Sequence, residues 1–161
     1  MKISTKGRYS TRAMIDLAVH SGQGPVQIKE IAARQEVSER YLEQLFILLK
    51  HAGLVKGFRG AHGGFTLAKP AKKIRLIDII EATERGVALA KCVHKPDRCS
   101  RSEVCLTRRI WAEIEKAISS ALRSLTLRDL VKQQTEGTKQ ALKEFSEKEC
   151  KSLQNSGYTM N

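Results

Sequence analysis

The order of apolar patterns between residues 4 and 68 constrains the fold more than any other feature of this chain. Apolar side chains recur at helical spacing over residues 4–20, 27–35 and 38–52, and Gly53 follows the third segment as a typical helix end. Two short strands are then expected on either side of a glycine-rich tip at 59–63. Closely joined helices followed by a hairpin form a winged helix-turn-helix. The sequence therefore predicts a mainly α-helical fold with a small β-hairpin wing.

The second half of the chain favours a dimer. A short helix is expected before residue 86, and residues 87–105 are polar. Residues 106–125 form a longer helix, whose apolar stripe is too broad for one small domain to cover. We expect this helix to pair with its copy in a second subunit. Thr126 and Asp129 form a capping box, which predicts a last short helix.

The charge of the chain indicates a polyanionic partner. The formal net charge is +12, and residues 1–74 hold 13 Lys and Arg against 5 Asp and Glu. Nucleic acid is favoured over lipid, because no strongly apolar amphipathic segment accompanies the basic residues. There is no nucleotide-binding loop or catalytic triad, so we do not expect an enzyme. The chain has no bilayer-length apolar run, and its start is unlike a secretory signal, so we expect a cytoplasmic protein without membrane contact.

These patterns divide the chain into four parts. They are a winged helix-turn-helix DNA-binding domain (1–84), a cysteine-bearing loop (85–105), a dimerisation helix with a short following helix (106–134), and a polar C-terminal tail (135–161).

The third predicted helix carries the side chains that a recognition helix presents to base edges. Arg40 and Gln44 share a face and suit guanine and adenine, whereas Glu43 accepts from cytosine. At the wing tip, Arg59 beside Gly60 suits a narrow minor groove. Phosphate contacts are expected from basic residues spread over this half of the chain, namely Lys2, Lys6, Arg8, Arg12, Lys29 and Lys56. The candidate DNA-binding residues are Lys6, Ser38, Arg40, Tyr41, Glu43, Gln44, Arg59, Gly60 and His62.

Three of the four cysteines lie close together, at Cys92, Cys99 and Cys105. Their spacing is wider than that of zinc knuckles, and iron-sulfur clusters are held mainly by thiolates. Grouped thiols in a reducing cytoplasm more often bind metal or sense redox state than form disulfides. A cluster is the leading hypothesis. A zinc site that adds His94 to the three thiols, and reduced cysteines packed as small hydrophobic residues, remain open.

Several short motifs together resemble the IscR/NsrR/CymR family of bacterial transcription regulators, the Rrf-two regulators. The resemblance covers residues 1 to about 134. It implies a homodimeric winged-helix regulator that, in many members, binds an iron-sulfur cluster through three cysteines in this loop, whereas CymR-like members lack the trio and sense through a partner protein. The motifs are Lys6-Gly7-Arg8-Tyr9, Tyr41-Leu42-Glu43-Gln44, Arg59-Gly60-Ala61-His62-Gly63-Gly64-Phe65, and Cys105-Leu106-Thr107 with Trp111.

The chain departs from this family at the fourth cluster ligand. In IscR-like proteins a histidine ligand follows the third cysteine after Leu-Thr, whereas this chain has Arg108, which stays protonated and does not ligate. NsrR-like proteins use an acidic residue near the start of the partner subunit, where this chain has Arg8. The candidates that remain are His94, Asp97, Glu103 and Cys150.

We therefore predict a homodimer that binds palindromic operator DNA and whose affinity is tuned by a 2Fe-2S or 4Fe-4S cluster. Two alternatives remain. The first is a zinc-binding or thiol-redox-sensing DNA-binding repressor, and the second is a winged-helix module that binds an acidic protein instead of DNA.

Overall fold

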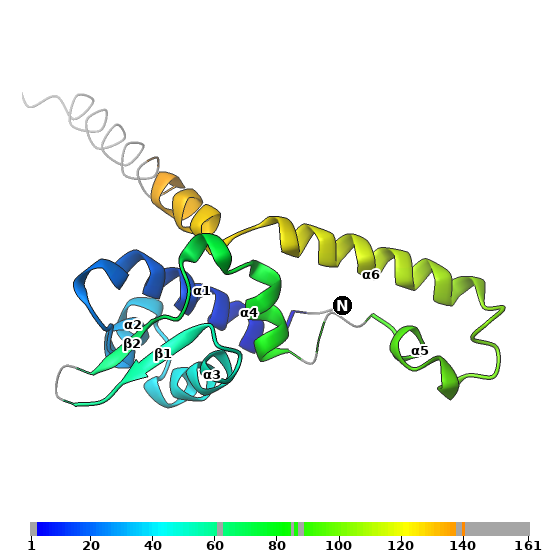
Figure 1. Cartoon of the computed structure of the whole chain (residues 1–161), viewed down its shortest axis with the longest axis horizontal. Helices are drawn as coiled ribbons and strands as arrows, with labels where there is room; N and C mark the ends of the chain where they lie inside the picture. Colours follow the sequence, from blue (N-terminus) through cyan, green and yellow to red (C-terminus); the bar gives the residue numbers. More distant parts are fainter. Residues whose placement is uncertain (1–2, 61–62, 85, 87–88, 138–139, 141–161) are drawn as a thin grey trace, which may run out of the picture.

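The computed structural model describes residues 3–60, 63–84, 86, 89–137 and 140. It confirms the mainly α-helical fold with one antiparallel hairpin. Figure 1 shows a head, made of the elements up to α4, and an arm in which α5 and α6 extend away from it. The head contains α1 (Thr5–His20), η1 (Ser21–Gln23), α2 (Ile28–Gln35), α3 (Glu39–His51), β1 (Val55–Phe58), β2 (Gly64–Leu67), η2 (Ala71–Lys73) and α4 (Leu76–Thr83). The arm contains α5 (Lys91–His94), η3 (Pro96–Arg98) and α6 (Leu106–Ser124), and residues 127–137 are helical again.

The turn between α2 and α3 is fixed by local hydrogen bonds. Helix α2 ends at Gln35, and the next residue, Glu36, adopts a left-handed conformation with φ 54° and donates its N–H to the carbonyls of Ala32 and Ala33. Ser38 then caps α3, because its hydroxyl accepts from the N–H of Tyr41 at 3.4 Å. The predicted helix-turn-helix is confirmed.

The wing is fastened to the loop that precedes α2. The strands pair from Val55 with Leu67 to Phe58 with Gly64. Val26 and Phe65 exchange two backbone hydrogen bonds of 2.9 and 2.8 Å, which adds a third strand-like segment. Gly64 is required here, because a Cβ at this position would collide with the backbone carbonyl of Val26.

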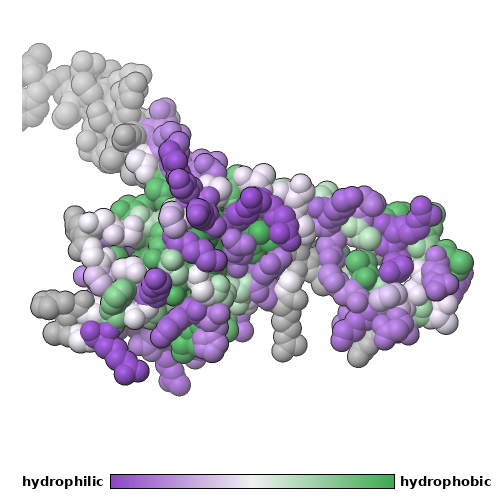
Figure 2. All heavy atoms as spheres, in the orientation of Figure 1, coloured by the Kyte–Doolittle hydropathy of each residue, from purple (hydrophilic) through white to green (hydrophobic). Residues whose placement is uncertain are grey.

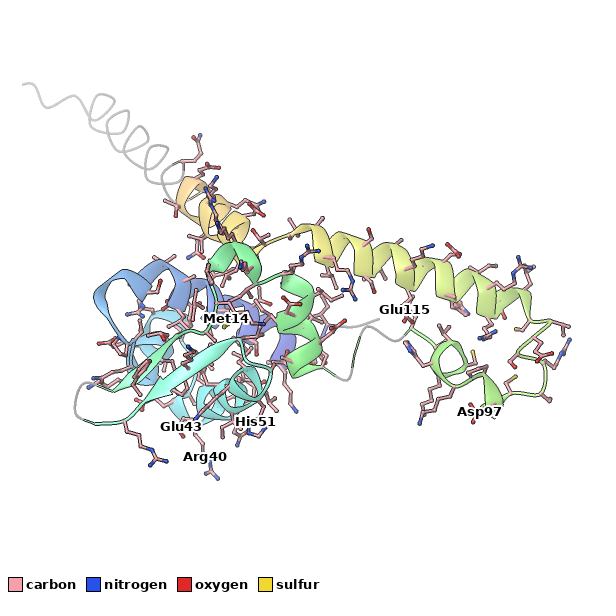
Figure 3. The ribbon with its side chains drawn as sticks, viewed as in Figure 1. Met14, Arg40, Glu43, His51, Asp97 and Glu115 are labelled. Carbon is pink, nitrogen blue, oxygen red and sulfur yellow. The ribbon has the colours of Figure 1, made fainter. Side chains whose placement is uncertain are left out.

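One apolar core holds α1, α2, α3 and the hairpin together. The Phe46 and Phe65 rings lie 4.7 Å apart, and Met14 lies in the interior of the head (Figure 3). The chain returns to this core after the arm. Leu127 is fully buried there, and its N–H donates to the carbonyl of Ile74 at 2.8 Å. The predicted helix start is confirmed, because Asp129 accepts from the backbone N–H of Thr126 at 3.1 Å.

The arm exposes much of its apolar surface. Ile118 and Leu122 pack on Ile77 and Ile80 of α4, but no residue of α6 is fully buried. Toward the free end of α6, the exposed apolar residues are Leu106, Ile110, Trp111 and Ile114. Green, hydrophobic spheres emerge at that end in Figure 2 among hydrophilic ones. No described helix is long and apolar enough to span a membrane.

The segment predicted as a polar loop is partly helical. Within residues 87–105, α5 and η3 form two short turns that apolar periodicity did not indicate. Long-range contacts from Arg108 and Glu115 of α6 reach α5 and the residues on either side of these turns.

Candidate nucleic-acid interface and cysteine loop

One face of α3 is polar and open to solvent. Leu42, Leu45, Phe46 and Leu49 are buried on the opposite face, so the helix has a fixed orientation on the core. Four candidate residues are exposed on or next to the polar face, namely Ser38, Arg40, Glu43 and Gln44. Figure 3 shows Arg40 and Glu43 projecting from the side of α3 that faces away from Met14 and the core.

Two of the predicted DNA-binding residues also support the fold. Ser38 is the cap of α3 described above. Tyr41 is half-buried, and its ring meets the Tyr9 ring edge-on at 6.0 Å. This contact holds the start of α3 against α1.

The interpretation of Arg12 as a phosphate contact changes in the structure. Its guanidinium lies 5.3 Å from the centre of the Tyr9 ring and donates to the side chain and carbonyl of Gln35 at 3.0 and 2.9 Å. Arg12 therefore joins α1 to the end of α2, and its donors are already used in part.

The wing extends beyond the body beside α3 (Figure 1). Arg59 is exposed at the end of β1. Gly60 has φ 107°, which an L side chain rarely adopts, and its carbonyl accepts from the N–H of Gly63 at 2.9 Å. The tip thus turns back tightly after Arg59. His62 lies outside the described residues.

Lys6 is exposed in the first turn of α1, which contains no acidic residue. The N–H of Lys6 donates to the hydroxyl of Ser4, the N-cap residue, and two neighbouring N–H groups are satisfied by Glu84, which follows α4. One oxygen of Glu84 accepts from the backbone N–H of Ser4 at 3.0 Å, from its hydroxyl at 2.6 Å and from the N–H of Gly7 at 3.2 Å. The carboxylate neutralises the helix end and leaves the Lys6 side chain to the surface.

A polar network between α1 and α2 was not predicted. Asp16 is 4 % exposed, and its carboxylate accepts from Arg34 at 2.7 to 3.1 Å and from the amide of Gln35 at 2.9 Å. The same contact raises the pKa of Arg34 above its ordinary value, chiefly through the hydrogen bond to Asp16. Asp16 lies 18 positions from Arg34 and 19 positions from Gln35 in the sequence. The only sequence signal for this network was an acidic residue on an apolar helix face.

The three clustered cysteines lie at successive points of the arm. Cys92 is half-buried in α5, Cys99 is exposed after η3, and Cys105 is half-buried where α6 begins. In this conformation they do not form a preassembled centre. Within the part of the chain that the structure describes, no three His, Cys, Asp or Glu side chains are grouped to hold a metal ion. Cys150 lies outside that part.

Two side chains of α6 hold the cysteine loop. Arg108, which stands where the resemblance to IscR-like proteins implies a histidine ligand, donates to the carbonyls of Cys92 and Ser102 at 2.9 and 3.1 Å. About two turns further along α6, Glu115 is paired with His94, and Oε1 of Glu115 lies 2.7 Å from Nε2 of His94. Glu115 also accepts from the N–H of Leu89 at 3.3 Å. Figure 3 shows Glu115 on α6 and Asp97 on the opposite side of the loop. His94 is thus held toward α6, whereas Asp97 and Glu103 are exposed.

The thiol of Cys105 has hydrogen-bond partners at the start of α6. Its Sγ lies 3.1 Å from the hydroxyl of Thr107, and this hydrogen bond, together with one from the backbone of Arg108, lowers the pKa of Cys105. The lowered pKa increases the fraction of thiolate at this position, which suits both metal ligation and reaction with oxidants.

Comparison with known proteins identifies the family. Residues 3–133 match the Rrf2 family, described as iron-dependent transcriptional regulators. The chain is 43 % identical over 132 residues to protein rrf2 of Nitratidesulfovibrio vulgaris, covering 82 % of this chain and 88 % of that protein. Its structure is similar to T. potens IscR, with 42 % identity, a TM-score of 0.69 and coverage of 85 % of this chain and 90 % of the other.

It is also similar to CymR, the global cysteine regulator of B. subtilis, with 39 % identity, a TM-score of 0.69 and coverage of 82 % of this chain and 97 % of the other. The match over most of the chain, the winged helix and the relatives at this identity agree with one another. The chain therefore belongs to the Rrf2 family, whose members are transcriptional regulators and not enzymes.

Proposed function

We propose that this regulator acts in the cytoplasm as a homodimer on palindromic operator DNA, and that an iron-sulfur cluster in the loop with Cys92, Cys99 and Cys105 tunes its affinity. The observation that carries the DNA-binding part is the polar, exposed face of α3 beside an extended wing with an exposed arginine. Both elements are held rigidly by the core, as recognition of base edges requires.

On this proposal α3 enters the major groove and the wing enters the adjacent minor groove. Arg40 and Gln44 pair with guanine and adenine, and Glu43 accepts from cytosine or repels phosphates of wrong sequences. Ser38 and Tyr41, at the start of α3, contact the DNA backbone, and Lys6 contributes a salt-dependent phosphate contact. Arg59 occupies the minor groove next to Gly60, supported by His62.

The proposed dimer interface is the exposed apolar face of α6. Leu106 is 67 % exposed and Trp111 44 % exposed, although both are large apolar residues on one amphipathic helix. A second copy covers them at a two-fold axis, which places two α3 helices on half-sites of a palindrome. Because α6 also contacts α4, the spacing of the two heads depends on how α6 lies.

The chemistry of the loop fits an iron-sulfur cluster, because its three free thiols are soft ligands of the kind that such clusters take. Cys92, Cys99 and Cys105 are the proposed ligands. For the fourth, His94 must leave Glu115, whereas Asp97 and Glu103 are exposed, and Cys150 lies in the tail. When bound, the cluster would add charge to the loop and link its cysteines, and both effects would depend on the supply of iron and on oxidants. The residues of the chain supply the anchoring, since Arg108 and Glu115 hold the loop on α6.

The DNA-binding part is tested with single substitutions that leave the core intact. Arg59→Ala and Arg40→Ala are expected to weaken binding to an operator selected from random DNA, measured by mobility shift, while the dimer stays folded. Lys132→Ala, an exposed charge change on the helix 127–137, is the matched control and keeps wild-type affinity. If all three variants bind the operator with wild-type affinity, the assignment of α3 and the wing as the DNA-binding elements is wrong. An acidic protein partner then becomes the better explanation.

The cluster part is tested by spectroscopy and elemental analysis. Anaerobic reconstitution of wild-type protein should give visible absorption and bound iron, and the triple variant Cys92→Ala/Cys99→Ala/Cys105→Ala should give neither. Identical spectra for the two proteins would remove the cluster from the proposal. Stoichiometric zinc in place of iron would instead support a structural zinc site with His94.

A second candidate function, thiol-based redox sensing, is favoured by one observation. The contacts of Thr107 and Arg108 lower the pKa of Cys105, which increases the thiolate available to oxidants. This function predicts that iron-free protein loses operator affinity after treatment with peroxide and regains it with a thiol reductant. The Cys105→Ser variant should not respond.

A further inference from the structure

The polar face of α3 contains one apolar side chain that the roles described so far do not use. Ile47 is 55 % exposed, more than any other large apolar residue that the structure describes between residues 3 and 84. Burial of such a side chain is favourable, so its exposure in the free protein leaves apolar surface available to a partner.

Helix geometry places Ile47 in the middle of the face proposed to read bases. At about 100° per residue, it lies about 40° around the helix axis from Glu43 and about 20° from Arg40. The buried residues of α3 lie on the opposite side. Figure 3 shows Arg40, Glu43 and His51 projecting from the same side of α3, and Ile47 falls between Glu43 and His51 at four-residue intervals.

The chemistry of the major groove identifies what an isoleucine on this face contacts. Base edges there present hydrogen-bonding groups and one apolar group, the 5-methyl of thymine. Arg40 and its polar neighbours can satisfy the hydrogen-bonding groups, whereas Ile47 has only a methyl surface to offer. Its β-branched side chain is also stiff at χ1, so it loses little freedom on contact.

We propose that Ile47 is a specificity-determining residue that contacts the 5-methyl group of a thymine in each half-site. Four residues of helix advance about 6 Å, so this thymine lies one or two base pairs from the base that faces Glu43. The inference rests on the proposed function, because it requires α3 to lie in the major groove.

The test uses full-length protein and an operator selected from a random-sequence duplex pool. Each thymine is replaced in turn by deoxyuridine, which lacks only the methyl group. Wild-type protein should lose about fourfold in affinity per half-site at one position, the factor that corresponds to about 0.8 kcal/mol for one buried methyl. Ile47→Ala should bind the thymine and deoxyuridine operators equally at that position.

Leu48→Ala is the matched control, because Leu48 is the next residue of α3 and is 37 % exposed but lies about 100° around the helix. This variant should keep the wild-type discrimination between thymine and deoxyuridine. Thermal unfolding of the Ile47→Ala and Leu48→Ala variants is the check that both are folded.

Each result decides the matter. The inference is overturned if wild-type protein binds every deoxyuridine operator as tightly as the parent, or if Ile47→Ala still discriminates. The Arg40→Ala variant separates this failure from that of the proposed function. If Arg40→Ala weakens binding while no thymine depends on Ile47, only the methyl contact is wrong. If Arg40→Ala and Arg59→Ala both keep wild-type affinity, α3 is not the reading helix.

Discussion

Removal of the Asp16 carboxylate should destabilise the head more than any surface substitution. Asp16 is 4 % exposed on α1, and three donor atoms from Arg34 and Gln35 point at it. Asp16→Ala leaves the Arg34 guanidinium beside α1 without its partner. The cost therefore comes mainly from the stranded cation and less from the lost contact itself.

The magnitude depends on how well water replaces the carboxylate. Loss of one partner of a buried ion pair costs about 3 to 5 kcal/mol. The Arg34 side chain is 35 % exposed, so solvent reaches it in the variant, and we reduce the expected loss to about 2 to 3 kcal/mol. For a protein of this size, that loss lowers Tm by about 4 to 12 °C. Asp16→Asn keeps the volume and one acceptor and should lose about half as much.

Circular dichroism during thermal and urea unfolding measures these losses, with every variant at one protein concentration because dimerisation adds to apparent stability. The double variant Asp16→Ala/Arg34→Ala should be no less stable than Asp16→Ala, since the stranded cation is gone. Losses that simply add in the double variant, or a Tm change in Asp16→Ala below about 2 °C, would refute the reasoning.

Three further predictions follow from particular contacts. Gly64→Ala should cost about 1 to 3 kcal/mol, because the new Cβ meets the Val26 carbonyl, whereas Gly22→Ala, with open space around it, should stay within about 0.5 kcal/mol in urea unfolding. Trp111→Asp should convert the proposed dimer to monomer in sedimentation, and Lys116→Asp, elsewhere on α6, should not. The hydroxyl and N–H of Thr126 lower the pKa of Asp129, so its contribution to stability is present above its ordinary pKa of 3.8 and is lost as pH falls through the lowered value. The Tm difference between wild type and Asp129→Asn should therefore shrink on acidification.

Local chemistry made the head predictable. The helix-turn-helix follows from apolar spacing, a cap at Ser38 and Gly53, which has φ 67° at the end of α3. The wing follows from two short apolar strands around glycines, and the capping box of Thr126 and Asp129 is visible in four letters of sequence. Each of these signals involves residues that are neighbours in the chain.

The features that sequence patterns missed depend on residues far apart. Glu84 accepts from Ser4, the N-cap residue 80 positions earlier, and Asp16 pairs with Arg34 across two helices. In the cysteine loop, α5 is contacted by Arg108 and Glu115, which reach back from α6 to Cys92 and His94. The spacing of apolar residues does not reveal such contacts, because a charged residue with a distant partner looks the same in the sequence as a charged residue that faces solvent.

The strength of these long-range contacts limits where a cluster can act. The cysteine loop is attached to α6 by only a few hydrogen bonds of Arg108 and Glu115, and a bond to a charged group is worth about 1.5 to 3 kcal/mol net. In contrast, the head is held by a whole cluster of buried apolar residues, and each large side chain among them contributes about 1.5 to 3 kcal/mol.

A ligand that draws Cys92, Cys99 and Cys105 together therefore rearranges the loop and α6 at far lower cost than it reshapes α3. On the proposed function, cluster binding then changes the spacing between the two heads of the dimer and leaves each reading face unchanged. Distance measurements between spin labels on the two α3 helices should shift on reconstitution, whereas the thymine discrimination of each half-site should not.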